Sequence, residues 1–199
     1  MEDQNPWWIG EKHPMYLDWE NYPVRWIPEI INFYHSRPYS LNFIVGPRQV
    51  GKTLSMLIYI HKILLGRVNP KAIFYYACDE ISDYRELGEI LDLYLKAREL
   101  WNIRSSYIFL DEITYVDEWW RAIKYRIDQK KFVRDILYIS GSTSIDILKA
   151  RERFPGRRGH GKDIIYFPMS FSEFAKKFSK ISIETTNIEN TEKWKRKIE

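Results

Sequence analysis

The pattern of apolar and polar residues alternates between short apolar runs and longer segments with helical periodicity. The short runs read as five buried strands, at residues 41–45, 72–78, 107–110, 136–139 and 164–167. Between them, apolar residues recur at every third or fourth position, which is typical of helices that cover a sheet. This alternation predicts the α/β class, with a three-layer arrangement around a parallel five-stranded sheet.

Within the helical segments, the spacing predicts which side chains are buried. The segment that opens near Ser82 carries one apolar stripe, formed by Tyr84, Leu87, Leu91 and Tyr94 or Leu95. In the next segment Val116, Trp120, Ile123 and Ile127 recur at helical spacing, which predicts a core position for Trp120 and a more marginal one for Trp119. A last helix is expected over residues 170–178.

The chain divides into three parts by composition. Residues 1–40 are rich in proline and predict an N-terminal arm with a short helix around 24–35. In this arm, Asn5-Pro6-Trp7-Trp8 reads as an aromatic anchor on the domain. A base-stacking platform is the less favoured alternative, because no basic cluster interleaves the tryptophans. The core spans 41–180, and 181–199 form a polar basic tail, either mobile or the start of a truncated region.

Composition limits the class of protein. The 199 residues are 45% hydrophobic and 29% charged, as in soluble globular proteins, and the 16% of aromatic residues supply a large core. A net charge of +4 suits an anionic ligand without requiring nucleic acid. The single cysteine, Cys78, excludes a disulfide framework within the chain and a cysteine-rich zinc site. Since neither a secretory signal nor an apolar run near 18 residues is seen, we expect a cytoplasmic protein without a membrane partner.

A phosphate-binding loop lies between the first strand and the next helix, where the chain matches the pattern G-x-x-x-x-G-K-[ST]. Gly46 and Gly51 permit backbone dihedrals that a Cβ would forbid, and the loop amides then face the phosphates. Lys52 reaches the β- and γ-phosphate oxygens, and the Thr53 hydroxyl ligates Mg²⁺. An ordinary glycine turn with a surface lysine is the weaker interpretation. The predicted nucleotide contacts are Gly46, Pro47, Arg48, Gln49, Val50, Gly51, Lys52, Thr53 and Leu54.

The magnesium shell also needs an aspartate at the end of a neighbouring strand. Asp79-Glu80 follows the strand at 72–78, and Asp111-Glu112 follows the strand at 107–110. We favour Asp111-Glu112, since three large apolar residues precede it and a strand with a polar turn follows. Asp111 then holds the metal shell, and Glu112 orients or deprotonates the attacking water. The alternatives are Asp79-Glu80 as the metal pair and Glu112 as a surface charge.

Hydroxyl and guanidinium groups follow the fourth strand. Ser140, Ser142, Thr143 and Ser144 offer hydroxyls near the γ-phosphate position, and Ser142 is the preferred sensor, although Ser-Gly-Ser is also common turn chemistry. Arg157 and Arg158 lie just before the fifth strand, where an arginine can stabilise the charge that spreads during transfer. A solvated basic loop is an equal alternative. We expect these arginines at the edge of the ligand-bearing end of the sheet, facing outward.

Taken in order, these elements resemble the AAA+ superfamily of P-loop ATPases. More narrowly, the chain is similar to prokaryotic AAA+ ATP-binding proteins whose ATPase domain precedes a C-terminal domain of unknown function. The resemblance covers about residues 5–178. It rests on Asn5-Pro6-Trp7-Trp8, the loop at 46–53, Phe-Leu-Asp-Glu-Ile at 109–113, Gly-Ser-Thr-Ser at 141–144, Pro-Gly-Arg-Arg-Gly at 155–159 and Pro-Met-Ser-Phe-Ser-Glu-Phe at 168–174.

The resemblance implies a P-loop NTPase fold with the additional strand of AAA+ proteins, and ATP and Mg²⁺ as cofactors. It implies the same roles for Lys52, Thr53, Asp111 and Glu112, and makes Ser142 the sensor. Arg157 or Arg158 becomes a finger that reaches the nucleotide of a neighbouring subunit, which implies a homo-oligomer. A helical lid usually follows the fifth strand, but only about 20 polar residues follow the last predicted helix, too few for a second core. We therefore expect either a fragment or a lidless variant.

Two classes of function follow from these residues. The first is Mg²⁺-dependent ATP hydrolysis coupled to a conformational output, with Glu112, Lys52, Ser142, Arg157 and Arg158 as the catalytic residues. The second is a nucleotide-gated binding or signalling module with little turnover, with association to nucleic acid as a weaker possibility. A small-molecule kinase is less favoured, and so is a GTPase, because the chain has no Asn-Lys-x-Asp motif.

Overall fold

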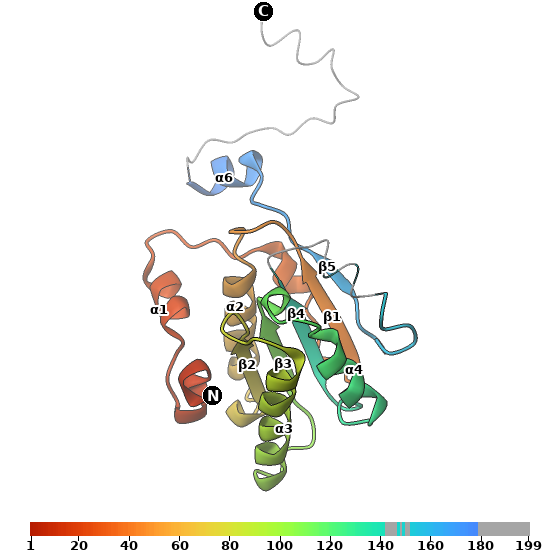
Figure 1. Ribbon diagram of the computed structural model, residues 1–199. Coiled ribbons are helices and arrows are strands. Elements are labelled where there is room, and N and C mark those ends of the chain that lie inside the picture. Colours follow the sequence, from red (N-terminus) through yellow and green to blue (C-terminus); the bar gives the residue numbers. More distant parts are fainter. Residues whose placement is uncertain (142–146, 148, 150–151, 179–199) are drawn as a thin grey trace, which may run out of the picture. The chain divides into compact units, whose positions relative to one another are not determined.

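A computed structural model describes residues 1–141, 147, 149 and 152–178 of the chain. The chain divides into two compact units, residues 1–167 and residues 168–199. The first unit contains the whole sheet (Figure 1). The second contains α6 (Phe171–Phe178), which begins with a capping box: Ser170 Oγ accepts from the backbone N–H of Glu173, whose carboxylate accepts from the backbone N–H of Ser170.

The five predicted strands form one parallel sheet, so the predicted fold class is confirmed. The strands lie in the order β2-β3-β4-β1-β5, and β4 separates β1 from β3 (Figure 1). The carboxyl ends of all five strands therefore meet along one edge of the sheet. Their bounds are β1 Ser40–Val45, β2 Ile73–Ala77, β3 Tyr107–Asp111, β4 Ile136–Ser140 and β5 Asp163–Ile165.

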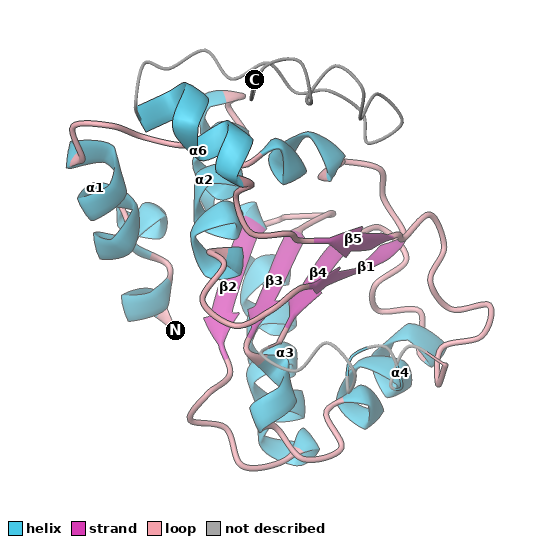
Figure 2. Cartoon of the chain, turned by 90° about the horizontal axis from the view of Figure 1, so that it is seen from above, coloured by secondary structure: helices cyan, strands magenta, loops and turns pink. Residues whose placement is uncertain are grey.

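Helices cover both faces of this sheet. On one face lie α1 (Pro14–Asn21) and α2 (Lys52–Leu65), and on the other lie α3 (Tyr84–Leu100) and α4 (Trp120–Asp128) (Figure 2). Short 3-10 helices join these elements, at Glu2–Gln4, Pro6–Ile9, Glu29–Phe33, Pro70–Ala72 and Ile113–Tyr115. None of the helices within the described ranges has the length and apolar character needed to cross a membrane.

Side chains of each strand alternate between the two faces. In β1, Phe43 and Val45 pack in the core on the α3 and α4 side, whereas Ile44 packs in the core on the α2 side. All three are buried, and a fully buried side chain of this size contributes about 1.5–3 kcal/mol. Because both faces are covered, the strands read as continuous apolar runs in the sequence.

The short helix predicted around 24–35 is present only in part. This segment contains only the 3-10 helix at Glu29–Phe33, since Pro28 lacks a backbone N–H and its ring would clash with the preceding turn of an α-helix. The arm instead contains α1, which the sequence reading missed. Its signals were Pro14 at the first helical position and His13 at the N-cap, whose side chain accepts from the backbone N–H of Met15 at 3.3 Å.

The prediction for the two tryptophans at 119 and 120 is wrong. Trp119 is 5% exposed and packs against Phe43 and Phe154, whereas Trp120 is only half-buried. The predicted stripe assumed one helix from Val116 onward, but α4 begins at Trp120 and Val116 lies in the preceding turn. Trp119, at the N-cap, has α-helical backbone angles and lies three, four and seven positions before the buried Ala122, Ile123 and Arg126, so the buried face of α4 includes Trp119 rather than Trp120.

The start of the arm is anchored on the outer edge of β2, as the aromatic motif predicted. The indole N–H groups of Trp7 and Trp8 both donate to Ile73 O, at 3.0 and 2.8 Å. Asn5 bonds with both backbone groups of Tyr75. These side chains form hydrogen bonds with backbone N–H and C=O groups at the outer edge of β2, which could otherwise pair with another strand. Since Trp7 is 2% exposed, it offers no face for stacking a base.

Candidate functional site

The loop at 46–51 joins the carboxyl end of β1 to the N-terminus of α2. Gly51 has φ +95°, a conformation that residues with a Cβ rarely adopt. A Cβ on Gly46 would lie 2.4 Å from the backbone oxygen of Tyr166, just past the end of β5. Both glycines of the motif are therefore required by the backbone path. The first N–H groups of α2 have no intrahelical acceptors and make this end of the helix electropositive.

The Lys52 side chain folds back over this loop and bonds with its first residues. Its ammonium donates to the carbonyl oxygens of Gly46 at 3.1 Å and Pro47 at 2.7 Å, and the residue is 5% exposed. Burial lowers the pKa of the Lys52 ammonium, while the negative charges of Glu112 and Asp111 oppose that shift. The loop thus holds a positive charge in a place with little access to water, where a phosphate would compensate it.

Asp111 ends β3 and is the best-connected carboxylate beside the loop. In the described part of the chain, four donors surround its two oxygens. Thr53 Oγ1 at 2.5 Å and the Tyr75 hydroxyl at 3.1 Å donate to Oδ2, while Ser140 Oγ and the Glu112 backbone N–H donate to Oδ1. Asp111 is 1% exposed, so this network fixes the carboxylate in one orientation.

The competing acidic pair lies elsewhere. Asp79 and Glu80 are exposed in the turn after β2, which is the edge strand farthest from β1 on that side of the sheet. Asp111 sits on β3, only one strand removed from β1, and receives the hydrogen bond from Thr53. Strand order therefore brings Asp111, and not Asp79, to the first turn of α2.

Glu112 follows in a left-handed backbone conformation, with φ +51°. Non-glycine residues adopt this region at a cost, and such residues concentrate at functional sites. The side chain is half-buried, and its charge acts on the Lys52 ammonium. The sharp turn at Glu112 thus keeps a second carboxylate close to the loop while its backbone N–H holds Asp111.

The donor set fits a hard cation bound together with phosphates. Thr53 and Asp111 supply hydroxyl and carboxylate oxygens, which are the ligands that Mg²⁺ prefers. Within residues 1–141, 147, 149 and 152–178, no three His, Cys, Asp or Glu side chains form a cage of their own. In magnesium sites of nucleotide-binding proteins, one or two protein oxygens share the ion with phosphates and water, and Thr53 and Asp111 offer oxygens of these kinds.

Two residues of this site, Ser140 and Tyr75, are not the ones that the sequence favours. Ser142, the preferred sensor, lies outside the described residues, as do Thr143 and Ser144. Ser140 takes the place beside Asp111, and the available signal was that it ends β4 as Asp111 ends β3. Tyr75 gave no signal of its own, since it reads as one apolar residue within a strand.

The arginines before β5 do not lie where the sequence analysis placed them. Arg158 pairs with Asp163 at 2.8 Å and donates to Leu41 O at 3.3 Å, at the amino end of β1. Arg157 pairs with Asp128, the last residue of α4, at 2.6 Å. Because β5 runs parallel to β1, a residue that precedes β5 lies at the amino edge, about 16 Å from the loop along the strand. The expected position at the ligand-bearing end is wrong.

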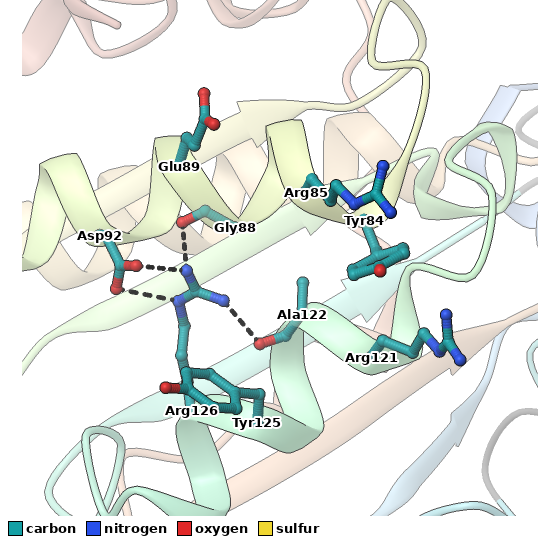
Figure 3. A pocket seen from close by; sticks show the side chains of 9 residues that line it. All are labelled: Tyr84, Arg85, Gly88, Glu89, Asp92, Arg121, Ala122, Tyr125 and Arg126. Atoms are coloured by element: carbon teal, nitrogen blue, oxygen red, sulfur yellow. Dashed lines mark hydrogen bonds and ion pairs between the residues drawn. The ribbon is translucent and has the colours of Figure 1, made fainter.

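A cavity of about 410 Å³ between α3 and α4 lies apart from the loop (Figure 3). The buried Arg126 guanidinium braces the two helices there. It donates to the carbonyl oxygens of Gly88 and Ala122 and pairs with Asp92. Every donor nitrogen of Arg126 thus has an acceptor, which is the pattern of a structural brace.

The sheet order, the glycine loop and the aspartate at the end of β3 define a P-loop nucleotide-binding domain of the α/β class. A family model described as an AAA domain matches residues 39–175. The chain therefore belongs to the AAA domain family, whose members are AAA-type ATPase domains. It matches none of the curated proteins with which it was compared.

Proposed function

We propose that this protein binds ATP with Mg²⁺ at the loop between β1 and α2 and hydrolyses it. The observation that carries this proposal is the 2.5 Å hydrogen bond from Thr53 to Asp111. It joins Thr53, which follows Lys52 in the loop motif, to the Asp111 carboxylate at the end of β3. A glycine turn with a surface lysine would need neither a buried lysine nor this partner.

Each part of the loop has a separate task in nucleotide binding. The backbone amides of the loop and of the first turn of α2 face the phosphates, and Lys52 exchanges its two carbonyl acceptors for phosphate oxygens. Thr53 and Asp111 would hold Mg²⁺, which neutralises charge on the phosphates when bound. Gly46 and Gly51 keep the backbone in the required path.

Glu112 would act as the general base in hydrolysis. Both oxygens of Asp111 already accept two donors each, so that carboxylate is poorly placed to take a proton from water. Glu112 is adjacent, ionisable and half-buried, which suits proton transfer. For the phosphate sensor we propose Ser140 beside Ser142, because its hydroxyl lies against Asp111.

An arginine would act between chains rather than within one. Arg158 is held by Asp163, by Leu41 O and by the ring of Phe43 at 4.9 Å, which suits a structural role. Arg157 has one partially exposed ion pair with Asp128. We therefore choose Arg157 as the residue that would reach the nucleotide of a second copy, and a homo-oligomer follows from this choice.

The position of the arginines also favours a second candidate function. Since Arg157 and Arg158 both lie at the amino edge of the sheet, neither assists hydrolysis at the loop of its own chain. A single chain would then bind ATP and turn it over slowly. In that case nucleotide occupancy, rather than hydrolysis, would set a conformation that a partner recognises.

Titration with a fluorescent ATP analogue tests the shared basis of both functions. Lys52→Ala removes a charged donor and should weaken binding at least tenfold, which corresponds to about 1.5–3 kcal/mol. The matched control is Lys62→Ala, an exposed lysine in the last turn of the same helix, which should bind as the unaltered protein does. Equal affinities for the Lys52 variant and the control would mean that the loop is not the site.

A further inference from the structure

The Tyr75 hydroxyl reaches Asp111 from the edge strand. We propose that Tyr75 is a positioning residue for Asp111, and that the N-terminal arm, through Asn5, holds Tyr75 in place. The inference rests on the proposed function, since it assigns Asp111 to magnesium binding. It extends the site from the loop to the first residues of the chain, since Asn5 lies 70 positions before Tyr75 in sequence.

Sheet register brings Tyr75 within reach of Asp111. Tyr75 pairs with Phe109, and Ala77 pairs with Asp111, so Tyr75 lies one pleat repeat before Asp111 on the neighbouring strand. Tyr75 and Phe109 both pack in the core on the α2 side of the sheet. The two-residue offset between Tyr75 and Asp111 along the strands is about 7 Å. A tyrosine side chain spans that distance, and its hydroxyl ends 3.1 Å from Oδ2 of Asp111. Phenylalanine would fill the same space without the hydrogen bond.

The direction of this hydrogen bond is defined. Tyr75 is 3% exposed, and burial together with the charge of Asp111 raises the pKa of its hydroxyl far above the usual range. The Tyr75 hydroxyl donates to Oδ2 of Asp111, the oxygen that also accepts from Thr53.

Asn5 clamps the backbone of the same tyrosine. Its side-chain amide donates to Tyr75 O at 2.9 Å, and the Tyr75 N–H donates to its Oδ1 at 2.7 Å. Asn5 is fully buried, and the His13 ring packs edge-on against the Tyr75 ring at 5.9 Å. The arm thus fixes both the strand position and the ring of the residue that touches Asp111.

Tyr75 matters most when Thr53 serves the metal. Among the described hydrogen bonds, Oδ2 of Asp111 accepts from Thr53 and Tyr75. Thr53 as a metal ligand would turn its oxygen toward the ion, and Tyr75 would remain to orient Oδ2. Loss of such an outer partner typically costs about 10–100-fold in metal affinity. The effect should appear only when magnesium is present, because Lys52 and the loop amides do not depend on Tyr75.

The test measures binding of a fluorescent ADP analogue in EDTA and across a MgCl₂ series. Tyr75→Phe should bind within about twofold of the unaltered protein in EDTA, whereas its half-saturating Mg²⁺ concentration should rise about tenfold or more. Asn5→Ala keeps the hydroxyl but removes the clamp, and should raise the Mg²⁺ requirement by a smaller factor. Tyr94→Phe is the matched control, since its buried hydroxyl bonds with Lys71 O and Ser106, away from Asp111.

Several outcomes would overturn the proposal. An unchanged Mg²⁺ requirement in Tyr75→Phe would remove its positioning role, and an equal rise in Tyr94→Phe would reduce it to general destabilisation. If Tyr75→Phe does not fold, judged by circular dichroism, an unchanged Mg²⁺ requirement in Asn5→Ala overturns the proposal. Absence of nucleotide binding by the unaltered protein is a different result, because it refutes the proposed function itself and this inference with it.

Discussion

At the scale of single residues, the two neighbouring carboxylates differ through their surroundings. Asp111 is buried and accepts four hydrogen bonds, which fix the orientation of its carboxylate. Glu112 is half-buried in a left-handed turn, next to the charge of Lys52. Environment therefore separates a carboxylate suited to a metal shell from one suited to moving a proton.

Glu112→Gln should separate nucleotide binding from hydrolysis. The amide keeps the shape of the side chain but cannot accept the proton of the attacking water, so phosphate release should fall about 100-fold or more. Binding of ATP with Mg²⁺ should persist, measured with the fluorescent analogue. Glu80→Gln is the control and should keep full turnover. The reverse result, with turnover lost only in Glu80→Gln, would assign the reaction to the other acidic pair.

At the scale of elements, the buried face of α4 decides which tryptophan belongs to the core. Trp119 precedes the helix and stacks on Phe154 with ring centroids 6.1 Å apart. Trp120 lies at the first helical position, where the Arg153 guanidinium covers its ring at 4.3 Å. A shift of one position around the helix axis thus exchanges a core side chain for a surface one.

Alanine substitutions at these two positions should have unequal effects on stability. Trp119→Ala leaves a cavity beside Phe43 and should lower the free energy of unfolding by about 3–5 kcal/mol. Trp120→Ala removes a half-buried ring and should cost about 1 kcal/mol. Urea denaturation followed by circular dichroism measures both. Equal losses, or a larger loss at Trp120, would contradict the packing described for α4.

At the scale of the whole molecule, the nucleotide loop and the arginines lie at opposite ends of the sheet. The loop follows the carboxyl end of β1, whereas Arg157 and Arg158 precede the amino end of β5. Because all five strands run in the same direction, residues that follow a strand and residues that precede one lie at opposite edges of the sheet. Contact of Arg157 or Arg158 with a nucleotide bound at the loop would then require a second copy of the chain.

A mixing experiment tests this arrangement. Arg157→Ala should bind ATP normally but lose turnover, since an arginine supplied in trans is worth about 10³–10⁵ in rate. Adding Lys52→Ala protein, which keeps Arg157 but binds ATP poorly, should restore part of the phosphate release. Arg153→Ala, in the same loop, serves as the control with full turnover. No rescue in mixtures that associate by analytical ultracentrifugation would contradict the role in trans.

The sequence by itself determined the parts of this protein that depend on neighbouring residues. The five strands, the glycine loop and the pair Asp111-Glu112 are contiguous segments, and their periodicity or spacing carries the physical requirement directly. The arm motif at Asn5–Trp8 could also be interpreted as an anchor, because its aromatic residues needed burial.

Only the tertiary structure decided which distant residues meet. The contact of Tyr75 with Asp111 spans 36 positions, and that of Asn5 with Tyr75 spans 70. Both follow from the order and register of strands, which no local pattern encodes. The position of Arg157 and Arg158 differs in this respect, since the parallel sheet that the sequence predicts already places residues that precede a strand at the amino edge. The period of the hydrophobic residues specifies whether a segment forms a helix or a strand. Strand order, direction and register specify which side chains meet at the site.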